Sequence, residues 1–285
     1  MTDIQKKVTE AVEDMQKKVS RDSKHIYIDR ETGIRLQGVS TVSSIVPKEW
    51  LAAWGAKEAV KALGYTDYED LTVATEMLQK IKNCTTSFQY IKILKEAKGA
   101  HARRSKQAML DGKLGHEWLE DASKARISGQ AITPIPSGTL ERPLTKVITW
   151  EQENIDYDIC AESFVCNLAR NYAGQLDKVC MLKTGELALI DYKFANHFSE
   201  EYQLQTAGYA ACFEPYGIKI DKRIIIRLPK TLEKEEWNEK EHKYYMVPND
   251  IEIKVIQSNY EFDRDAFYAA LVVKAWINRV VGVDK

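Results

Sequence analysis

The chain has 285 residues, of which 44% are hydrophobic and 29% charged, and its formal net charge is −1. These proportions are typical of a globular protein with one large domain or two small ones. They exclude a globally basic surface for nucleic acids, so contact with DNA would need a local track of basic residues. The sequence contains no run of about 18 apolar residues, so it predicts no membrane helix, and we expect no membrane partner.

The N-terminal third of the chain is predicted to be mainly helical. Residues 1–22 form an amphipathic pattern without the apolar segment of a signal peptide. A β-hairpin is predicted at 25–36, followed by helices at 40–64 with a break at Pro47, at 71–83 and at 87–97. Trp50 and Trp54 lie four residues apart on one helix face, which favours core packing over base stacking.

A basic segment, 92–113, leads into and along a long helix predicted at 100–124. It contains seven cations and few acids: Lys92, Lys95, Lys98, Arg103, Arg104, Lys106 and Lys113. We interpret the segment as a phosphate-contacting track, with Arg103 and Arg104 as substrate-binding residues. The alternative is the solvated face of a helix.

The same helix carries a candidate metal ligand, His116, with Glu120 one turn later on the same face. Gly112 and Gly115 allow another backbone to approach this part of the helix closely. A lone histidine on a helix is more often an ordinary core or surface residue, so other motifs must support it as a ligand.

The second half of the chain is predicted to be richer in strands. A Pro- and Gly-containing connector at 129–142 is followed by strands, a helix, a charged insertion, a mixed segment that is a candidate for another strand, and a closing helix. The strands are expected at 144–150, 155–166, 172–192 (as a hairpin) and 223–228, the helix at 200–214, the insertion at 233–243, the mixed segment at 244–256 and the closing helix at 263–281. This order predicts an α/β fold with a central mixed β-sheet flanked by helices.

The most informative motif is a hairpin that brings two carboxylates and an amine together. Two apolar runs surround the turn signal at 183–186, so Asp177 is expected to lie opposite Asp191, to within about one residue. Lys193 points the same way as Asp191, because strand side chains alternate. Paired carboxylates select Mg²⁺ or Mn²⁺, and a nearby ammonium suits the activation of water or the stabilisation of charge. The alternative is a pair of salt-bridged acids at the edge of a turn.

These motifs together resemble the PD-(D/E)XK nuclease superfamily, in its RecB-like exonuclease branch. The resemblance rests on four motifs in order: G-V-S-T-V-S-S-I-V-P-K from Gly38, G-K-L-G-H-E from Gly112, G-Q-L-D from Gly174 followed by I-D-Y-K to Lys193, and Q-T-A-G-Y from Gln205. It extends from about Tyr27 to Tyr209. The motif from Gly38, followed by W-G-A-K-E-A from Trp54, is similar to the opening of phage-encoded members, and the mitochondrial genome-maintenance exonuclease shares the general plan. It implies a restriction-endonuclease-like core at 100–285, with an N-terminal helical extension at 1–99, in a single nuclease domain spanning 1–285.

The resemblance also implies roles for individual residues. Asp177, Asp191 and Lys193 would be catalytic, and the metal ligands would be His116, the two aspartates and the backbone carbonyl of Tyr192. Gln205 and Tyr209 are candidate substrate-binding residues on one face of a helix, although packing of that helix on the sheet is the alternative. Glu120 and Glu162 are weaker candidates, as a neighbour of the metal site and as an additional acidic ligand.

The function implied is a Mg²⁺- or Mn²⁺-dependent DNA exonuclease, with single-stranded ends as the favoured substrate and a place in phage DNA recombination, repair or degradation. The alternatives are a structure-selective endonuclease and a non-catalytic DNA-binding recombination module of the same fold. An RNA-processing nuclease also stays open. The sequence contains no recognisable reader of the RNA 2′-OH.

The five cysteines predict free thiols rather than a cofactor site. Some RecB-like nucleases hold an iron–sulfur cluster by four cysteines, several of them near the C-terminus. Here the cysteines are scattered, none follows Cys212, and no C-x-x-C occurs. We therefore expect no iron–sulfur cluster, and a reducing cytoplasm, which would be that of the host for a phage-encoded protein.

Overall fold

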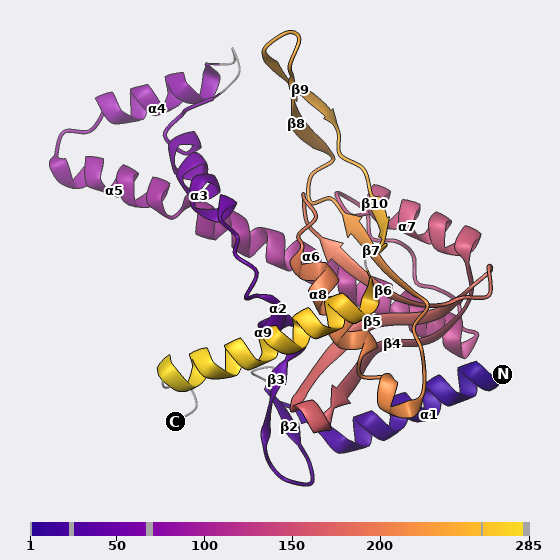
Figure 1. Cartoon of the computed structure of the whole chain (residues 1–285). Helices are drawn as coiled ribbons and strands as arrows, with labels where there is room; N and C mark the ends of the chain where they lie inside the picture. Colours follow the sequence, from indigo (N-terminus) through magenta and orange to yellow (C-terminus); the bar gives the residue numbers. More distant parts are fainter. Residues whose placement is uncertain (1, 23–25, 67–70, 258, 282–285) are drawn as a thin grey trace. The chain divides into compact units, whose positions relative to one another are not determined.

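The computed structural model describes residues 2–22, 26–66, 71–257 and 259–281, and Figure 1 shows its elements along the chain. The chain divides into two compact units. The first comprises Met1–Val46, Leu114–Lys230 and Asp250–Lys285, and the second comprises Pro47–Lys113 and Thr231–Asn249. Whether the chain functions as the single expected domain stays a prediction.

The first unit is built around a mixed sheet that has eight strands within the described residues. Its order is β1 (Val19–Arg21), β2 (Tyr27–Asp29), β3 (Arg35–Gly38), β5 (Tyr172–Leu182), β6 (Leu187–Phe194), β7 (Lys222–Leu228) and β10 (Glu252–Val255), and β4 (Ile155–Asn167) also pairs with β5. The β3–β5 and β6–β7 pairs are parallel and the others antiparallel. The expected α/β fold with a central mixed sheet is confirmed.

Strand β5 has different partners along its length. β4 pairs with it from end to end, whereas β3 meets Tyr172 and Ala173, and β6 meets the stretch from Lys178 to Met181. Residues 174–177 lie between these last two pairings. Asp177 is therefore at the point where the β5–β6 ladder begins.

Two hydrophobic cores cover the two faces of this sheet, as the alternation along β6 shows. Leu187 and Leu189 face the first core, and Ala188 and Ile190 face the second. The first core is formed with α1 (Asp3–Lys18), α2 (Val39–Ser43), α8 (Glu201–Ala210) and α9 (Tyr260–Val281), and the second with α6 (Ala100–Ser128) and α7 (Glu141–Asn154).

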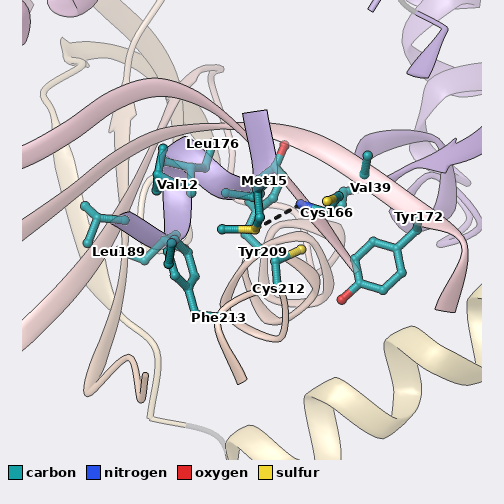
Figure 2. Close-up of a cluster of buried hydrophobic side chains, with 14 of the residues drawn as sticks. Val12, Met15, Val39, Cys166, Tyr172, Leu176, Leu189, Tyr209, Cys212 and Phe213 are labelled. Atoms are coloured by element: carbon teal, nitrogen blue, oxygen red, sulfur yellow. Dashed lines mark hydrogen bonds between the residues drawn. The ribbon is translucent and has the colours of Figure 1, made fainter. Parts of the chain in front are cut away.

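Figure 2 shows the first core, where Met15 of α1 lies against Cys166 of β4. Helix α1 buries Val8, Ala11, Val12 and Met15 at the i, i+3, i+4 and i+7 spacing of an amphipathic helix. The helix expected within the first 22 residues is therefore present as α1, and it is amphipathic.

The second unit is mainly helical. It contains α3 (Trp50–Lys61), α4 (Thr72–Lys82), α5 (Ser87–Lys98) and residues 100–113 of α6, and its second segment forms a hairpin of β8 (Glu233–Asn238) and β9 (Lys243–Pro248) (Figure 1). Helix α5 begins with a capping box between Thr86 and Gln89. The side chain of Trp50 is not among those described, so the predicted pair with Trp54 lies outside the described residues.

One secondary-structure prediction is wrong. Residues 144–150 form part of α7 rather than a strand. The β-branched residues in this stretch favour a strand locally, but Leu144, Val147 and Glu151 are buried at helical spacing. Two further segments differ in detail: the charged insertion at 233–243 is mostly hairpin, and the N-terminal segment contributes β1 to β3 to the sheet.

Candidate metal centre

The β5–β6 hairpin has the register that the sequence predicts. Lys178 pairs with Ile190 and Val179 with Leu189, so Asp177 and Asp191 occupy the next opposed positions. The turn contains Gly185 at φ +84, a left-handed conformation that glycine adopts without steric cost. In addition, the backbone N–H of Tyr192 donates to Asp177 Oδ2 at 2.6 Å, which fixes that carboxylate across the hairpin.

Three side chains from three elements converge beside this hairpin. His116 of α6, Glu162 of β4 and Asp177 of β5 each place one ligand atom within 4.8 Å of the other two. The distance from His116 Nδ1 to Asp177 Oδ2 is 3.9 Å. One imidazole nitrogen and two carboxylates form a donor set that suits Mn²⁺ or Mg²⁺.

Glu162 lies in this group at a position where the backbone of β4 is irregular. Its φ is +45, in the left-handed region that a glutamate rarely adopts, and it lies between the pairs Ala161–Lys178 and Ser163–Leu176. By this register it is opposite Asp177. Strained conformations of this kind are concentrated at functional sites, where the surrounding structure stabilises them.

Asp191 and Lys193 form an ion pair on β6. Lys193 Nζ lies 2.7 Å from Asp191 Oδ2, and the side chains are 17% and 1% exposed. Asp191 Oδ1 is buried and accepts no hydrogen bond from any residue that the structure describes. Lys193 Nζ also lies 5.2 Å from the centre of the Tyr202 ring, a cation–π contact that the sequence did not suggest.

The protonation of the site follows from burial and from the proximity of like charges. Burial, and after it the positive charge of Lys193, lowers the pKa of His116 to about 4, so the imidazole is neutral at pH 7 and keeps a lone pair. Burial and the carboxylates of Asp177 and Glu120 raise the pKa of Glu162 to about 8. Burial also raises the pKa of Asp177, and it raises that of Asp191 to about 6 despite the opposing charge of Lys193.

These residues fit a divalent cation. The protein gathers three carboxyl groups whose charged forms are disfavoured by burial and mutual repulsion, and a cation of charge two would offset both effects. One carboxylate oxygen, Asp191 Oδ1, is buried without a donor in the described structure. The histidine is in the neutral form that binds metals.

Close packing of α6 on β6 brings His116 to the hairpin. A Cβ atom added at Gly115 would lie 2.1 Å from Phe194 Cζ, so only glycine admits the ring at this position. The His116 and Phe194 rings are 5.0 Å apart between centroids. Gly115 is therefore the site of a close approach, but the group that approaches it is a side chain of β6 rather than the expected backbone.

Three other predicted residues of the first unit, Glu120, Gln205 and Tyr209, bond or pack with other residues. Glu120 is paired with Lys124. Gln205 and Tyr209 are both buried, and Gln205 Nε2 donates to the Tyr209 hydroxyl at 3.0 Å. The Tyr209 ring packs on Gly174, where an added Cβ would lie 2.6 Å from Tyr209 Cε1. Substrate binding by Gln205 and Tyr209 stays a prediction, as does the backbone carbonyl of Tyr192 as a ligand.

Arg103 and Arg104 belong to the second unit. Arg104 Nη1 donates to both carboxylate oxygens of the buried Glu58, at 2.9 and 3.1 Å, and Arg103 Nη2 donates to the backbone carbonyl of Glu96 at 2.6 Å. Both side chains are therefore engaged within the unit. Beside them is an open groove of about 880 Å³ that is largely apolar and lined among others by Trp54, His101, Lys48 and Lys98.

Sequence reasoning missed a buried ionic cluster next to the hairpin, formed by Arg126, Glu151, Asp158, Lys178 and Tyr192. The signal that was available is Lys178, a lysine inside an otherwise apolar strand. Its partner Glu151 was not recognised, because the segment before it was interpreted as a strand.

No model of a known protein family matches the chain, and no curated protein matches it. Of the helices that the structure describes, none is both long and apolar enough to span a membrane. The five cysteines have free thiols, and all except Cys84 are buried. The expected absence of an iron–sulfur cluster stays a prediction.

Proposed function

We propose that this protein is a Mg²⁺- or Mn²⁺-dependent deoxyribonuclease of the PD-(D/E)XK type. It would hydrolyse phosphodiester bonds at single-stranded DNA ends, in phage DNA recombination, repair or degradation. The observation that carries the proposal is the convergence of His116, Glu162 and Asp177 beside the Asp191–Lys193 pair. A neutral imidazole and buried carboxylates in one place suit a divalent cation, and a neighbouring ammonium suits the stabilisation of phosphate charge during hydrolysis.

In this proposal the chain's own residues have distinct tasks. The carboxylates of Glu162, Asp177 and Asp191 and the imidazole of His116 would hold the cation, which when bound would supply activation of a water and neutralisation of charge. Burial lowers the pKa of Lys193, but the charges of Asp191 and Asp177 outweigh this effect and raise it overall. Lys193 is therefore an ammonium at neutral pH, which favours stabilisation of phosphate charge over abstraction of a proton.

DNA binding is proposed for the second unit. Residues 92–113 contain seven cations against two acids, Glu96 and Asp111. The nearby groove places the Trp54 and His101 rings, 6.5 Å apart between centroids, together with Lys48 and Lys98. Aromatic faces next to cations are the combination on which single-stranded bases stack, and we propose single-stranded DNA as the occupant of this groove.

The test is digestion of end-labelled linear single-stranded, linear double-stranded and circular single-stranded DNA with Mg²⁺, with Mn²⁺ and with excess chelator. We expect degradation of linear single strands that requires metal, together with resistance of the circle. Asp177→Asn and Asp191→Asn should each abolish cleavage while circular dichroism shows an intact fold. Cleavage of circles at a comparable rate would indicate an endonuclease, and full turnover in chelator would exclude the metal site.

If metal binds and DNA binds but no substrate is cleaved, the protein is the non-catalytic recombination module instead. RNA of the same sequence belongs in the same experiment, because the site residues do not distinguish the two sugars. Selective cleavage of RNA would support the proposed metal chemistry and show that the substrate is RNA rather than DNA.

A further inference from the structure

The metal centre shares four structural elements with the buried ionic cluster of Arg126, Glu151, Asp158, Lys178 and Tyr192. Helix α6 carries His116 and Arg126, β4 carries Glu162 and Asp158, β5 carries Asp177 and Lys178, and β6 carries Asp191 and Tyr192. The fifth member, Glu151, comes from α7. Each element that supplies a candidate ligand thus also supplies one member of the cluster.

Glu151 is the residue to which most of the cluster connects. Its Oε1 lies 2.5 Å from Lys178 Nζ and accepts from the Tyr192 hydroxyl, and its Oε2 lies 2.7 Å from Arg126 Nη2. Asp158 closes the ring, with Oδ2 2.7 Å from Arg126 Nε and Oδ1 3.5 Å from Lys178 Nζ. The charges of the two cations and the two carboxylates balance, and the side chain of Lys178 is completely buried.

Two direct connections join the cluster to the ligands. Lys178 and Tyr192 are the sequence neighbours of Asp177 and Asp191, and neighbouring strand side chains point to opposite faces. Moreover, Tyr192 forms hydrogen bonds both to the cluster and to a candidate ligand. Its hydroxyl donates to Glu151, and its backbone N–H donates to Asp177 Oδ2 at 2.6 Å. A shift of the Tyr192 side chain would therefore move the donor that orients a ligand.

Stability alone does not account for such a cluster. Well-packed apolar residues of similar volume often stabilise a protein as much as a buried ion pair, or more. What an ionic cluster adds is geometry, because its hydrogen bonds are satisfied at only one relative position of the elements that carry them. Here those elements are α6, β4, β5 and β6, whose spacing decides whether His116, Glu162 and Asp177 meet.

We propose that Glu151 and Tyr192 are positioning residues of the metal centre, and that the ionic cluster sets the spacing of the four elements that carry the ligands. The proposal rests on the proposed function for the claim that these ligands bind metal. Neither residue needs to touch the cation or the substrate through its side chain.

The test compares Tyr192→Phe and Glu151→Gln with Tyr216→Phe. The control removes a similar bond, from the Tyr216 hydroxyl to Asp14 Oδ2 at 2.6 Å, in the same unit and away from the ligands. We measure the Mn²⁺ dissociation constant by calorimetry, the thermal midpoint of the metal-free protein, and hydrogen exchange of the Tyr192 amide without metal.

For Tyr192→Phe we expect Mn²⁺ affinity to fall by roughly 10-fold, the lower end of the effect of removing a residue that supports a ligand. Exchange of the Tyr192 amide should become faster. Tyr216→Phe should lower the thermal midpoint without changing either quantity. Glu151→Gln should also weaken Mn²⁺ binding because it leaves the cluster with excess positive charge, and adding Lys178→Met should restore the affinity by restoring the balance.

The proposal is overturned if Tyr192→Phe binds Mn²⁺ as tightly as the parent and retains the parent's amide exchange. Because that variant removes a single oxygen, it decides the question even if Glu151→Gln does not fold. If the parent binds no Mn²⁺, the proposed function fails at the metal site. The exchange measurement then still decides whether the cluster positions the Tyr192 amide.

Discussion

Replacement of Gly115 by alanine tests how His116 reaches the hairpin. The added Cβ would lie 2.1 and 2.3 Å from Phe194 Cζ and Cε1, whereas carbon atoms are at their most favourable separation at roughly 3.5–4.0 Å. Helix α6 and the ring must therefore move apart by about 1.5 Å. That movement would carry His116 away from Asp177, to which it is 3.9 Å in the parent.

The expected energy is the difference of two effects. Overpacking of a core costs about 1–3 kcal/mol, and alanine in a helix interior regains about 1 kcal/mol relative to glycine. We therefore expect Gly115→Ala to lose about 0–2 kcal/mol of stability in urea denaturation, and Mn²⁺ affinity to fall by roughly 10-fold.

A double mutant separates this clash from other effects of the substitution. Phe194→Leu removes the ring atoms that the new Cβ would meet, so Gly115→Ala/Phe194→Leu should bind Mn²⁺ more tightly than Gly115→Ala. It should also be more stable than the sum of the single changes predicts, by about 0.5–3 kcal/mol. If Gly115→Ala instead stabilises the protein and leaves Mn²⁺ affinity unchanged, the close packing of α6 on Phe194 is not what positions His116.

Four further outcomes follow. Lys193→Ala should lower turnover by about 10²-fold or more, with DNA affinity in Ca²⁺ nearly unchanged, and cleavage at the parent rate would remove Lys193 from the mechanism. Because the pKa of Glu162 is raised to about 8 from 4.5, the metal-free protein should lose stability as the pH rises between these values. Urea denaturation at pH 5 and pH 8 should show that Glu162→Gln removes on the order of 1–2 kcal/mol of this loss. Arg103→Ala should weaken DNA binding and reduce its salt slope by about 1, with single-turnover cleavage unaffected. Trp54→Ala should weaken binding of single-stranded DNA by about 1–3 kcal/mol and that of duplex far less, in fluorescence titrations.

The sequence predicts the parts of this protein that depend on local rules. The opposition of Asp177 and Asp191 needs only a turn at 183–186 and the alternation of strand side chains, and the structure has that register. The amphipathic face of α1 and the closing helix α9 follow from periodicity in the same way. The proximity of His116 to Asp177, in contrast, was expected only from a family resemblance, because no local pattern joins α6 to β5.

Other features depend on tertiary structure and were not predictable from the sequence. The place of Glu162 in the candidate metal centre depends on a left-handed backbone conformation within β4, which the surrounding amino-acid sequence does not signal. Glu151 was missed because burial, rather than local propensity, determines that α7 is a helix. The engagement of Arg104 by Glu58 depends on how α3 packs on α6, and sequence reasoning saw only an exposed basic track.

The composition of the first unit has a consequence for the order of events during synthesis. Its candidate ligands lie between His116 and Tyr192, but the core against which they are held includes Phe267 and Leu271 of α9, and β10 closes the sheet beside β7. Strand β3 must also wait for β5, more than 130 residues later, before it can pair. A nascent chain that already contains every candidate ligand therefore still lacks the scaffold that brings them together. Any chemistry of the candidate metal centre would begin only when α9 has left the ribosome.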